Sequence, residues 1–258
     1  MSSLQGKVAV VTGAGRGIGR AIALLLARQG MLVGVNDLQA ESVSKVTDEI
    51  KAAGGHALPL VGSVSDLADV TWIFEQVESE LGPLWLLVNN AGIINAAPTA
   101  ELTEEMWDKA FAVDAKGVFL CSQAAIRRMI PRRAGRIVNF SSIAGLIVRT
   151  SQIAYCSAKA AVVHFTRCLA VEMAPYGITV NCLCPGMTWT EMLQETARER
   201  GLDLDAMVAL IPAGHMAQEA DHAHLVAYFA SEESHHVTGQ VVTVDGAQSL
   251  YHPLTIKG

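Results

Sequence analysis

Cysteine, basic residues and long apolar runs are all scarce in this chain. The 258 residues include five cysteines, and the N-terminus has no signal-peptide pattern. An odd number of thiols without a secretion signal indicates reduced cysteines and a cytoplasmic protein. The longest apolar helical run, residues 21–27, is far too short to cross a bilayer, so no membrane partner is expected. Lys and Arg number 19 against 25 Asp and Glu, without a long basic run, so no nucleic-acid partner is expected.

The chain also lacks a pattern of metal ligands. Four histidines lie near the C-terminus, at His222, His224, His235 and His236. No cysteine or carboxylate set at metal-ligand spacing accompanies them, so we expect surface positions and no metal site. Cys182 and Cys184 alternate on an expected strand and therefore point to one face. Small buried core residues are the better interpretation of this pair than metal ligands.

Short apolar segments alternate with longer helical patterns along the whole chain. The expected strands are 8–11, 32–35, 57–61, 84–88, 136–140, 178–183 and 241–244. The expected helices are 18–29, 39–53, 67–81, 104–129, 153–174 and 218–230. Nearly continuous apolar strands are typical of a sheet that is buried on both faces. The pattern predicts one α/β domain over residues 1–258, a three-layer doubly wound Rossmann fold with a mostly parallel seven-stranded sheet.

Residues 187–216 interrupt this alternation with an extra, apolar helical insertion. Its apolar members are Trp189, Met192, Leu193, Leu202, Leu204, Met207, Leu210 and Ile211. Ligands bind beyond the carboxyl ends of the strands in such sheets, so an insertion there predicts a substrate lid. Surface decoration that packs on its own neighbours is the alternative.

A glycine-rich loop, residues 12–19, follows the first expected strand and opens the first helix. Glycines there allow a tight turn and close approach of the backbone to phosphate, although strict G-x-G-x-x-G does not fit. The second strand ends at Asp37, whose carboxylate can accept hydrogen bonds from a ribose and would repel a 2′-phosphate. Arg16 could instead pair with that phosphate. The carboxylate should dominate, so NAD is the favoured cofactor and NADP the alternative.

Tyr155 and Lys159 lie four residues apart, which places them on one face of an expected helix. A nearby ammonium favours the phenolate form of a tyrosine and makes it a usable acid or base near neutral pH. Taken alone, such a pair more often belongs to a solvated helix face.

Several motifs in order resemble the short-chain dehydrogenase/reductase family in its single-domain form. They are T-G-x-x-x-G-x-G from Thr12, N-N-A-G from Asn89, Ser142 thirteen positions before Tyr155, Y-x-x-x-K from Tyr155, Pro185-Gly186, T-G-Q from Thr238 and Asp245-Gly246. The resemblance covers about residues 7–250.

The resemblance implies a role for each motif residue. Tyr155 would exchange a proton with the substrate oxygen, Lys159 would hold the nicotinamide ribose, and Ser142 would hydrogen-bond the reacting oxygen. The implied cofactor contacts are Gly13, Arg16, Gly17, Ile18, Gly19, Asp37, Ser63, Val64, Asn90, Tyr155, Lys159, Pro185, Gly186, Thr188 and Thr190.

Two positions depart from the family pattern. Asp114 stands where the family has an Asn that helps to hold a water in a proton relay, twenty-eight positions before Ser142. A carboxylate there accepts hydrogen bonds but cannot donate as an amide does, so we expect a shifted pH profile with the relay retained. Ser63 replaces an acid that bonds the adenine amine, and its hydroxyl can accept that bond more weakly.

The expected substrate pocket is mostly apolar. Its members are Ile93, Ile94, Ala144, Gln152, Met187, Trp189 and Met192. No convergent Arg or Lys is expected there, which favours a neutral, fairly apolar secondary alcohol or ketone. Arg149 is better read as a solvent or interface residue, and Gln152 and His215 are weaker candidates for polar contacts.

Two other functions remain open from the sequence. An NADPH-dependent 3-oxoacyl-type reductase is the enzyme alternative, and a non-catalytic nucleotide-binding protein is the other. The resemblance also implies a homotetramer, with helices 104–129 and 153–174 in one interface and the last strand with the tail, residues 247–258, in another. A monomer in light scattering at micromolar concentration would count against this assembly.

Overall fold

Seven parallel strands form one sheet in the order β3-β2-β1-β4-β5-β6-β7. The computed structural model of the protein describes residues 4–251, except for the side chains of Met192, Thr196, Glu199 and Arg200. The strands are β1 (Val8–Val11), β2 (Leu32–Asp37), β3 (His56–Val61), β4 (Leu84–Asn89), β5 (Gly135–Phe140), β6 (Ile178–Pro185) and β7 (Val241–Val244). Strand order reverses between β1 and β4, and a crevice for ligands is expected beyond the carboxyl ends there.

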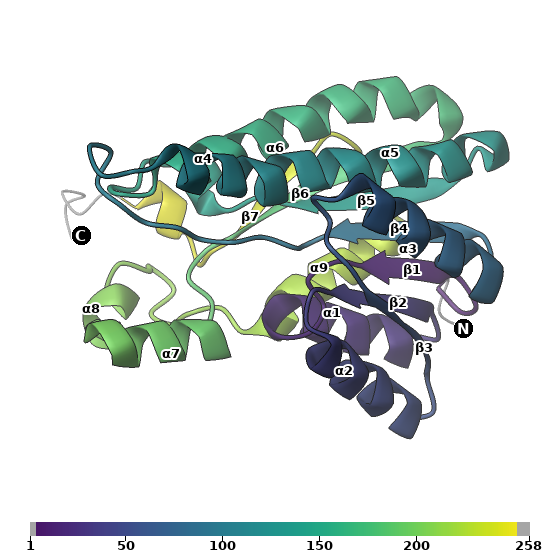
Figure 1. Ribbon diagram of the computed structural model, residues 1–258, viewed down its shortest axis with the longest axis horizontal. Helices are drawn as coiled ribbons and strands as arrows, with labels where there is room; N and C mark the ends of the chain where they lie inside the picture. The colour runs from purple at the N-terminus through teal and green to yellow at the C-terminus, as the bar shows by residue number, and fades with distance from the viewer. Residues whose placement is uncertain (1–3, 252–258) are drawn as a thin grey trace.

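Helices cover both faces of the sheet, as the alternating pattern predicts (Figure 1). One face carries α1 (Gly17–Arg28), α2 (Ala40–Ala52) and α9 (Glu219–Ala230). The other carries α3 (Leu67–Glu80), α5 (Gly117–Met129) and α6 (Ile153–Met173). The central strands are buried on both faces because each face packs against one of these helical layers. The doubly wound Rossmann fold is therefore confirmed.

The segment predicted as one long helix over residues 104–129 is broken in the middle. It consists of α4 (Glu104–Phe111), a π-helical turn (Ala112–Lys116) and α5. A π-turn adds a residue to one helical turn and so rotates the face that follows it. The apolar periodicity of the sequence does not mark this turn, although Asp114, the departure from the family pattern, lies inside it.

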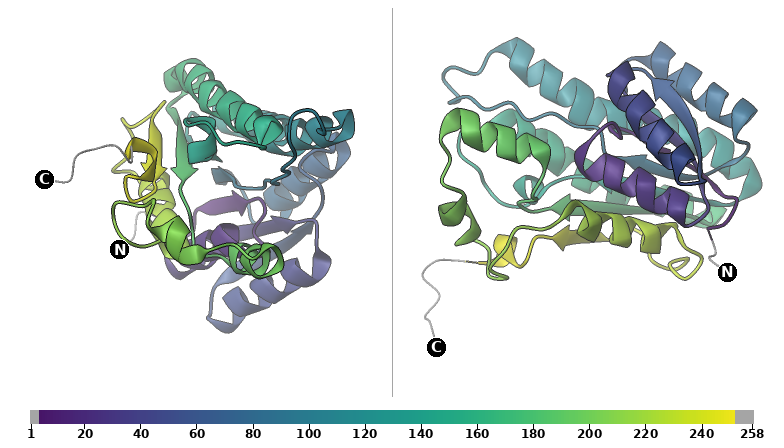
Figure 2. Two further views of the ribbon diagram at one scale, coloured as in Figure 1. Left: turned by 90° about the vertical axis from the view of Figure 1, so that its left-hand side faces the viewer. Right: turned by 90° about the horizontal axis from the view of Figure 1, so that it is seen from below.

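The insertion at residues 187–216 forms two short helices, α7 (Glu191–Arg200) and α8 (Leu204–Val208). They lie beyond the carboxyl ends of the strands and apart from the three layers (Figures 1 and 2). Thr190 and Asp203 begin them, because each side-chain oxygen accepts a hydrogen bond from a backbone N–H in the first turn. The position suits a lid, and the lid role stays a prediction.

Two smaller expectations concern residues 4–251, and a third lies mostly beyond them. No helix there is both long and apolar enough to span a membrane. Cys182 and Cys184 are fully buried with their sulfur atoms 4.0 Å apart, so the prediction of core residues is confirmed. Of the expected interface tail, residues 252–258 lie outside the described part of the chain.

Candidate active site at the carboxyl ends of the strands

The loop between β1 and α1 is tied to the end of β4 by side-chain hydrogen bonds. The Thr12 hydroxyl accepts from the backbone N–H groups of Asn90 and Ala91, each at 3.1 Å. The Asn90 amide donates to the carbonyls of Thr12 and Gly13, each at 3.0 Å. The two loops that flank the strand-order reversal are thus held together, and Asn90 acts here as a support for the glycine loop.

Glycine is required in this loop for two separate reasons. Gly13 and Gly17 have φ angles of +62° and +59°, in the left-handed region that disfavours other residues. A Cβ on Gly19 would lie 2.2 Å from the Gly13 carbonyl oxygen, which no side chain tolerates. In the described chain no side chain caps α1, whose Ncap is Arg16 and whose first turn carries no acidic residue. Its first N–H groups therefore remain available to an anion, and this cradle fits the pyrophosphate of a dinucleotide.

Asp37 is held at the end of β2 by backbone donors. Its Oδ2 accepts from the Gly15 N–H at 3.0 Å, and its Oδ1 accepts from the Leu38 N–H at 2.8 Å. The carboxylate is only partly exposed, whereas the Arg16 side chain is exposed. The negative group is therefore the fixed one of the two that could meet the adenosine ribose.

Ser63 and Val64, expected near the adenine, are fixed by a residue that the sequence reasoning missed. The carboxylate of Asp69 accepts from the Ser63 N–H at 2.8 Å. The Ser63 hydroxyl bonds Ser65 Oγ at 2.8 Å, and buried Val64 packs against Gly117. An acid in the first turn of α3 was the available signal for Asp69.

Ser142, Tyr155 and Lys159 come from the end of β5 and the first two turns of α6. Ser142 begins a 3₁₀ turn, where its Oγ accepts from the Ala144 N–H at 3.1 Å. Tyr155 and Lys159 are both buried, and the Lys159 ammonium lies 5.7 Å from the centre of the Tyr155 ring. Lys159 Nζ also donates to the Phe140 carbonyl at 3.2 Å, a backbone contact that no sequence motif marks.

Asp114 forms a buried ion pair with Lys159. Its Oδ1 lies 3.1 Å from Lys159 Nζ and accepts from the Ile93 N–H at 3.1 Å. Its Oδ2 is buried without a partner among the described residues. Gly92 is needed beside the pair, because a Cβ there would lie 2.6 Å from Asp114 Oδ1.

Burial and the charge of the partner act in opposite directions on the pKa of each member of the ion pair. Burial raises the pKa of the Asp114 carboxyl, and the attraction of Lys159 only partly offsets that rise. Burial also opposes the charge on Lys159, but the Asp114 carboxylate and then Tyr155 outweigh it, so the pKa of the ammonium is raised. Lys159 therefore stays charged while the second oxygen of its partner lacks a donor.

The turn after β6 is the part of the site where one expectation is wrong. His222 is fully buried rather than on the surface, and its Nε2 lies 2.8 Å from Thr188 Oγ1. Gly186 lies so close to Asp245 that a Cβ would be 2.5 Å from the Asp245 Cβ. Thr190 caps α7. An apolar α9 face was the only sequence signal that could have placed His222 inside.

One expected substrate residue lines a groove beside the insertion. Trp189 lines a groove of about 410 Å³ together with Val208, Gly214, His215, Met216 and Gln218. Ile94, Ala144, Gln152 and Met187 are not among its lining residues, and Ile94 is 58% exposed. The side chain of Met192 lies outside the described part of the structure. Trp189 and the weaker candidate His215 share this groove, and the rest of the expected pocket stays a prediction.

Comparison with known proteins shows similarity along nearly the whole chain. A family model described as short chain dehydrogenase matches residues 7–201. The chain is 39% identical to the BbsD subunit of (2S)-((R)-hydroxy(phenyl)methyl)succinyl-CoA dehydrogenase of Thauera aromatica, over 96% of this chain and 98% of that protein. It is 38% identical to a 3-oxoacyl-(acyl-carrier-protein) reductase of Staphylococcus aureus, over 95% and 98%. A crystal structure of a short-chain type dehydrogenase/reductase from Mycobacterium marinum matches with a TM-score of 0.89 and 35% identity, over 95% of this chain and 96% of that one.

Proposed function

The chain belongs to the short-chain dehydrogenase family of oxidoreductases, and on that premise we propose that it transfers a hydride between NAD(H) and a neutral, fairly apolar secondary alcohol or ketone. The observation that carries the proposal is the cluster of Ser142, Tyr155 and Lys159 beside the glycine cradle. A bound nicotinamide dinucleotide would supply or accept the hydride.

Tyr155 is the proton donor and acceptor for the substrate oxygen. Lys159 supports this role, because a positive charge near the ring favours the phenolate that must form when the proton leaves. Ser142 Oγ accepts from the Ala144 N–H, so its own proton is available to the substrate oxygen as charge develops there. Asp114 holds Lys159 in place and lowers the net positive charge beside Tyr155.

Asp37 supports NAD(H) over NADP(H). The Gly15 and Leu38 N–H groups donate to its two oxygens and fix the orientation of the carboxylate. Each oxygen keeps a lone pair that can accept a hydrogen bond from a ribose hydroxyl. A 2′-phosphate at the same place would meet a fixed negative charge.

A neutral substrate is supported by the apolar surface near the expected mouth of the site. Ile94, Leu146 and Trp189 are 58%, 44% and 40% exposed. The name of the relative from Thauera aromatica describes a secondary alcohol next to a phenyl ring, which supports the reacting group; the same name describes a charged succinyl-CoA thioester, so it does not support neutrality.

The second candidate is an NADPH-dependent reductase of 3-oxoacyl groups. Two observations favour it, the 38% identity to the Staphylococcus aureus reductase and the exposed Arg16 beside the ribose end of the cradle. Arg16 could pair with a 2′-phosphate only if it outweighed Asp37.

The test is turnover of a panel of secondary alcohols, ketones and 3-oxoacyl thioesters with NADH, NAD, NADPH and NADP. We expect kcat/KM with NADH at least about tenfold above that with NADPH, because the wrong charge at the ribose costs more than about 1.4 kcal/mol. Tyr155→Phe should lower turnover about 10²–10⁴-fold, whereas Tyr228→Phe, on the exposed face of α9, should not. Faster turnover with NADPH on oxoacyl thioesters would favour the second candidate, and cofactor binding without any turnover would exclude both.

A further inference from the structure

The two ends of the insertion at residues 187–216 meet at its base. Thr188 and Ala217 form an isolated parallel bridge outside the main sheet. The Trp189 N–H donates to the Ala217 carbonyl at 2.9 Å, and the Ala217 N–H donates to the Met187 carbonyl at 3.0 Å. Helices α7 and α8 therefore emerge from a backbone junction and return to it.

A buried side-chain hydrogen bond joins this junction to α9. His222 Nε2 lies 2.8 Å from Thr188 Oγ1, and Thr188 Oγ1 lies 3.2 Å from the Gly186 carbonyl. The two side chains are nearly inaccessible, with exposures of 0% for His222 and 8% for Thr188. Solvent can therefore not replace either partner of the bond without opening the structure.

The network assigns the tautomer of the ring. Thr188 has one hydroxyl proton, and the Gly186 carbonyl is an acceptor for it. His222 then donates from Nε2–H to Thr188 Oγ1 and leaves Nδ1 as a bare acceptor, which has no partner in the described part of the chain. The opposite tautomer would bury an N–H group without an acceptor. Burial lowers the pKa of His222 to about 4, so the ring is neutral at pH 7.

The ring makes a poor core residue in energetic terms. It buries two polar nitrogen atoms, and only one of them has a partner. An apolar side chain of similar size would avoid that desolvation cost. The contact that the histidine adds is the one to Thr188, which lies in the turn that would meet the nicotinamide end of the cofactor.

We infer that His222 is a positioning residue that clamps Thr188 and the turn at residues 186–190 onto α9. This inference rests on the proposed function, because the turn matters only if a nicotinamide lies against it. Helix α9 packs directly on α1, whose N-terminus would hold the pyrophosphate. The His222–Thr188 bond thereby fixes the two ends of the cofactor site relative to each other.

The test compares amide hydrogen exchange of the free protein in four forms. These are the wild type, His222→Gln, His222→Asn and Thr188→Val. A Gln amide reaches the position of Nε2, whereas an Asn amide reaches only that of Nδ1, so Gln can keep the bond and Asn cannot. We expect the Trp189 and Ala217 amides to exchange about tenfold faster in the Asn and Val variants, and within about threefold of wild type in the Gln variant.

Steady-state kinetics provide the second measurement. The Asn variant of His222 should raise KM for the nicotinamide cofactor about tenfold with kcat changed by less than about threefold, and the Gln variant should restore KM. Thr188→Val is used for hydrogen exchange alone, because Thr188 would itself contact the cofactor. Equal exchange rates in the Gln and Asn variants, or no change in the Val variant, would overturn the inference. An absence of turnover in the wild type would refute the proposed function instead, while the exchange result on the free protein would still decide the clamp.

Discussion

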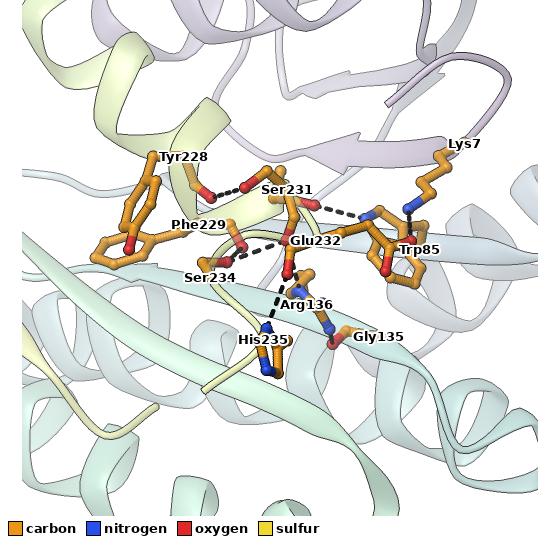
Figure 3. A network of polar contacts seen from close by, with 11 residues as sticks. Lys7, Trp85, Gly135, Arg136, Tyr228, Phe229, Ser231, Glu232, Ser234 and His235 are labelled. Carbon is orange, nitrogen blue, oxygen red and sulfur yellow. Dashed lines mark hydrogen bonds and ion pairs between the residues drawn. The ribbon is translucent and has the colours of Figure 1, made fainter. Parts of the chain in front are cut away.

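The two ends of the parallel sheet differ in how their large buried polar side chains are paired. At the amino end, Arg136 is 4% exposed, and its guanidinium lies 4.5 Å from the ring centre of Trp85 (Figure 3). It donates to the carbonyls of Ser231 and Gly135 at 3.3 and 2.9 Å. Burial lowers the pKa of Arg136, and Glu232 partly offsets the effect. This charge is surrounded by carbonyl groups and an aromatic face.

At the carboxyl end, the buried polar groups are only partly compensated. Asp114 pairs with Lys159 through one oxygen and leaves the other without a partner. His222 likewise uses one nitrogen and leaves Nδ1 unsatisfied among the described residues. Buried polar atoms without partners cost stability. The amino end is not free of this cost, since Thr179 Oγ1 near the start of β6 is also buried without a partner in the described chain; the larger groups, Asp114 and His222, lie at the carboxyl end.

This comparison favours a structural role for the amino end and is consistent with the proposed chemistry at the carboxyl end. The amino end also joins distant segments, since Lys7 lies 3.6 Å from the ring centre of Trp85 and 2.6 Å from Glu232. Trp85 Nε1 donates to the Ala230 carbonyl at 2.8 Å, at the end of α9. A change at the amino end should lower stability without altering catalysis, and a change at the carboxyl end should alter both activity and pH dependence.

The largest effect is expected for Arg136→Met. The variant loses the contact with Trp85 and leaves the Ser231 and Gly135 carbonyls with one donor fewer, which should lower the free energy of unfolding by about 3–4 kcal/mol. Urea denaturation measures this loss. Turnover at 25 °C should stay within about twofold of wild type, because the residue lies at the far end of the strands from the site.

Lys7→Met is the matched control for this variant. Its ammonium contacts the same ring, but the partner Glu232 is 62% exposed, so the loss should be only about 1 kcal/mol. Equal losses in the two variants would contradict the idea that burial makes Arg136 the more important cation. A large fall in turnover for Arg136→Met would contradict the separation of the two ends.

The next effect concerns acid stability at His222. Burial lowers the pKa of its ring from 6.5 to about 4 in the folded protein. Between these values the unfolded chain binds a proton that the folded protein does not bind. The contribution of the neutral His222 ring to the free energy of unfolding is therefore intact above pH 6.5, and it is lost progressively as the pH falls toward 4.

Wild type should accordingly lose about 3 kcal/mol of stability relative to His222→Gln between pH 7 and pH 4. Urea denaturation of both proteins at several pH values measures the difference. The Gln side chain has a similar reach but does not titrate. All other titratable groups are the same in the two proteins, so the difference between them reports on the ring of His222. A difference in stability that stays constant across this range would show that the ring is not held neutral.

Sequence reasoning predicts the frame of this molecule well because period and burial decide it. Strands β1 and β7 begin and end where the apolar runs do, and the alternation of elements predicts three layers. The glycine loop could also be predicted from its glycines. The structure gives the reason for two of them, since Gly13 and Gly17 have positive φ angles that few other residues adopt.

Pairings between distant segments could not be predicted in the same way. The π-turn that buries Asp114 depends on packing against α6, because an isolated helix gains nothing from the extra residue. The apolar face of α9 could have indicated that His222 is buried, but nothing in that local pattern indicates its hydrogen bond to Thr188, thirty-four residues away. Composition and periodicity are the weakest guides to the positions of buried polar side chains such as these, whose burial costs stability locally.

The smallest effect, and the sharpest test of the carboxyl end, is expected for Asp114→Asn. The variant keeps an oxygen for the Ile93 N–H but removes the negative charge 3.1 Å from Lys159. The variant also loses the largest effect that raises the pKa of Lys159. At pH values where Lys159 keeps its proton, an ammonium that is no longer neutralised favours the phenolate of Tyr155 more strongly, so the pH dependence of alcohol oxidation should move to lower pH by about one unit. The measurement is kcat/KM for alcohol oxidation between pH 5 and 10, where the shift appears as about a tenfold gain on the acid side. If the profile of the variant overlays that of wild type, Asp114 accepts the Ile93 N–H at the π-turn and has no electrostatic influence on proton transfer.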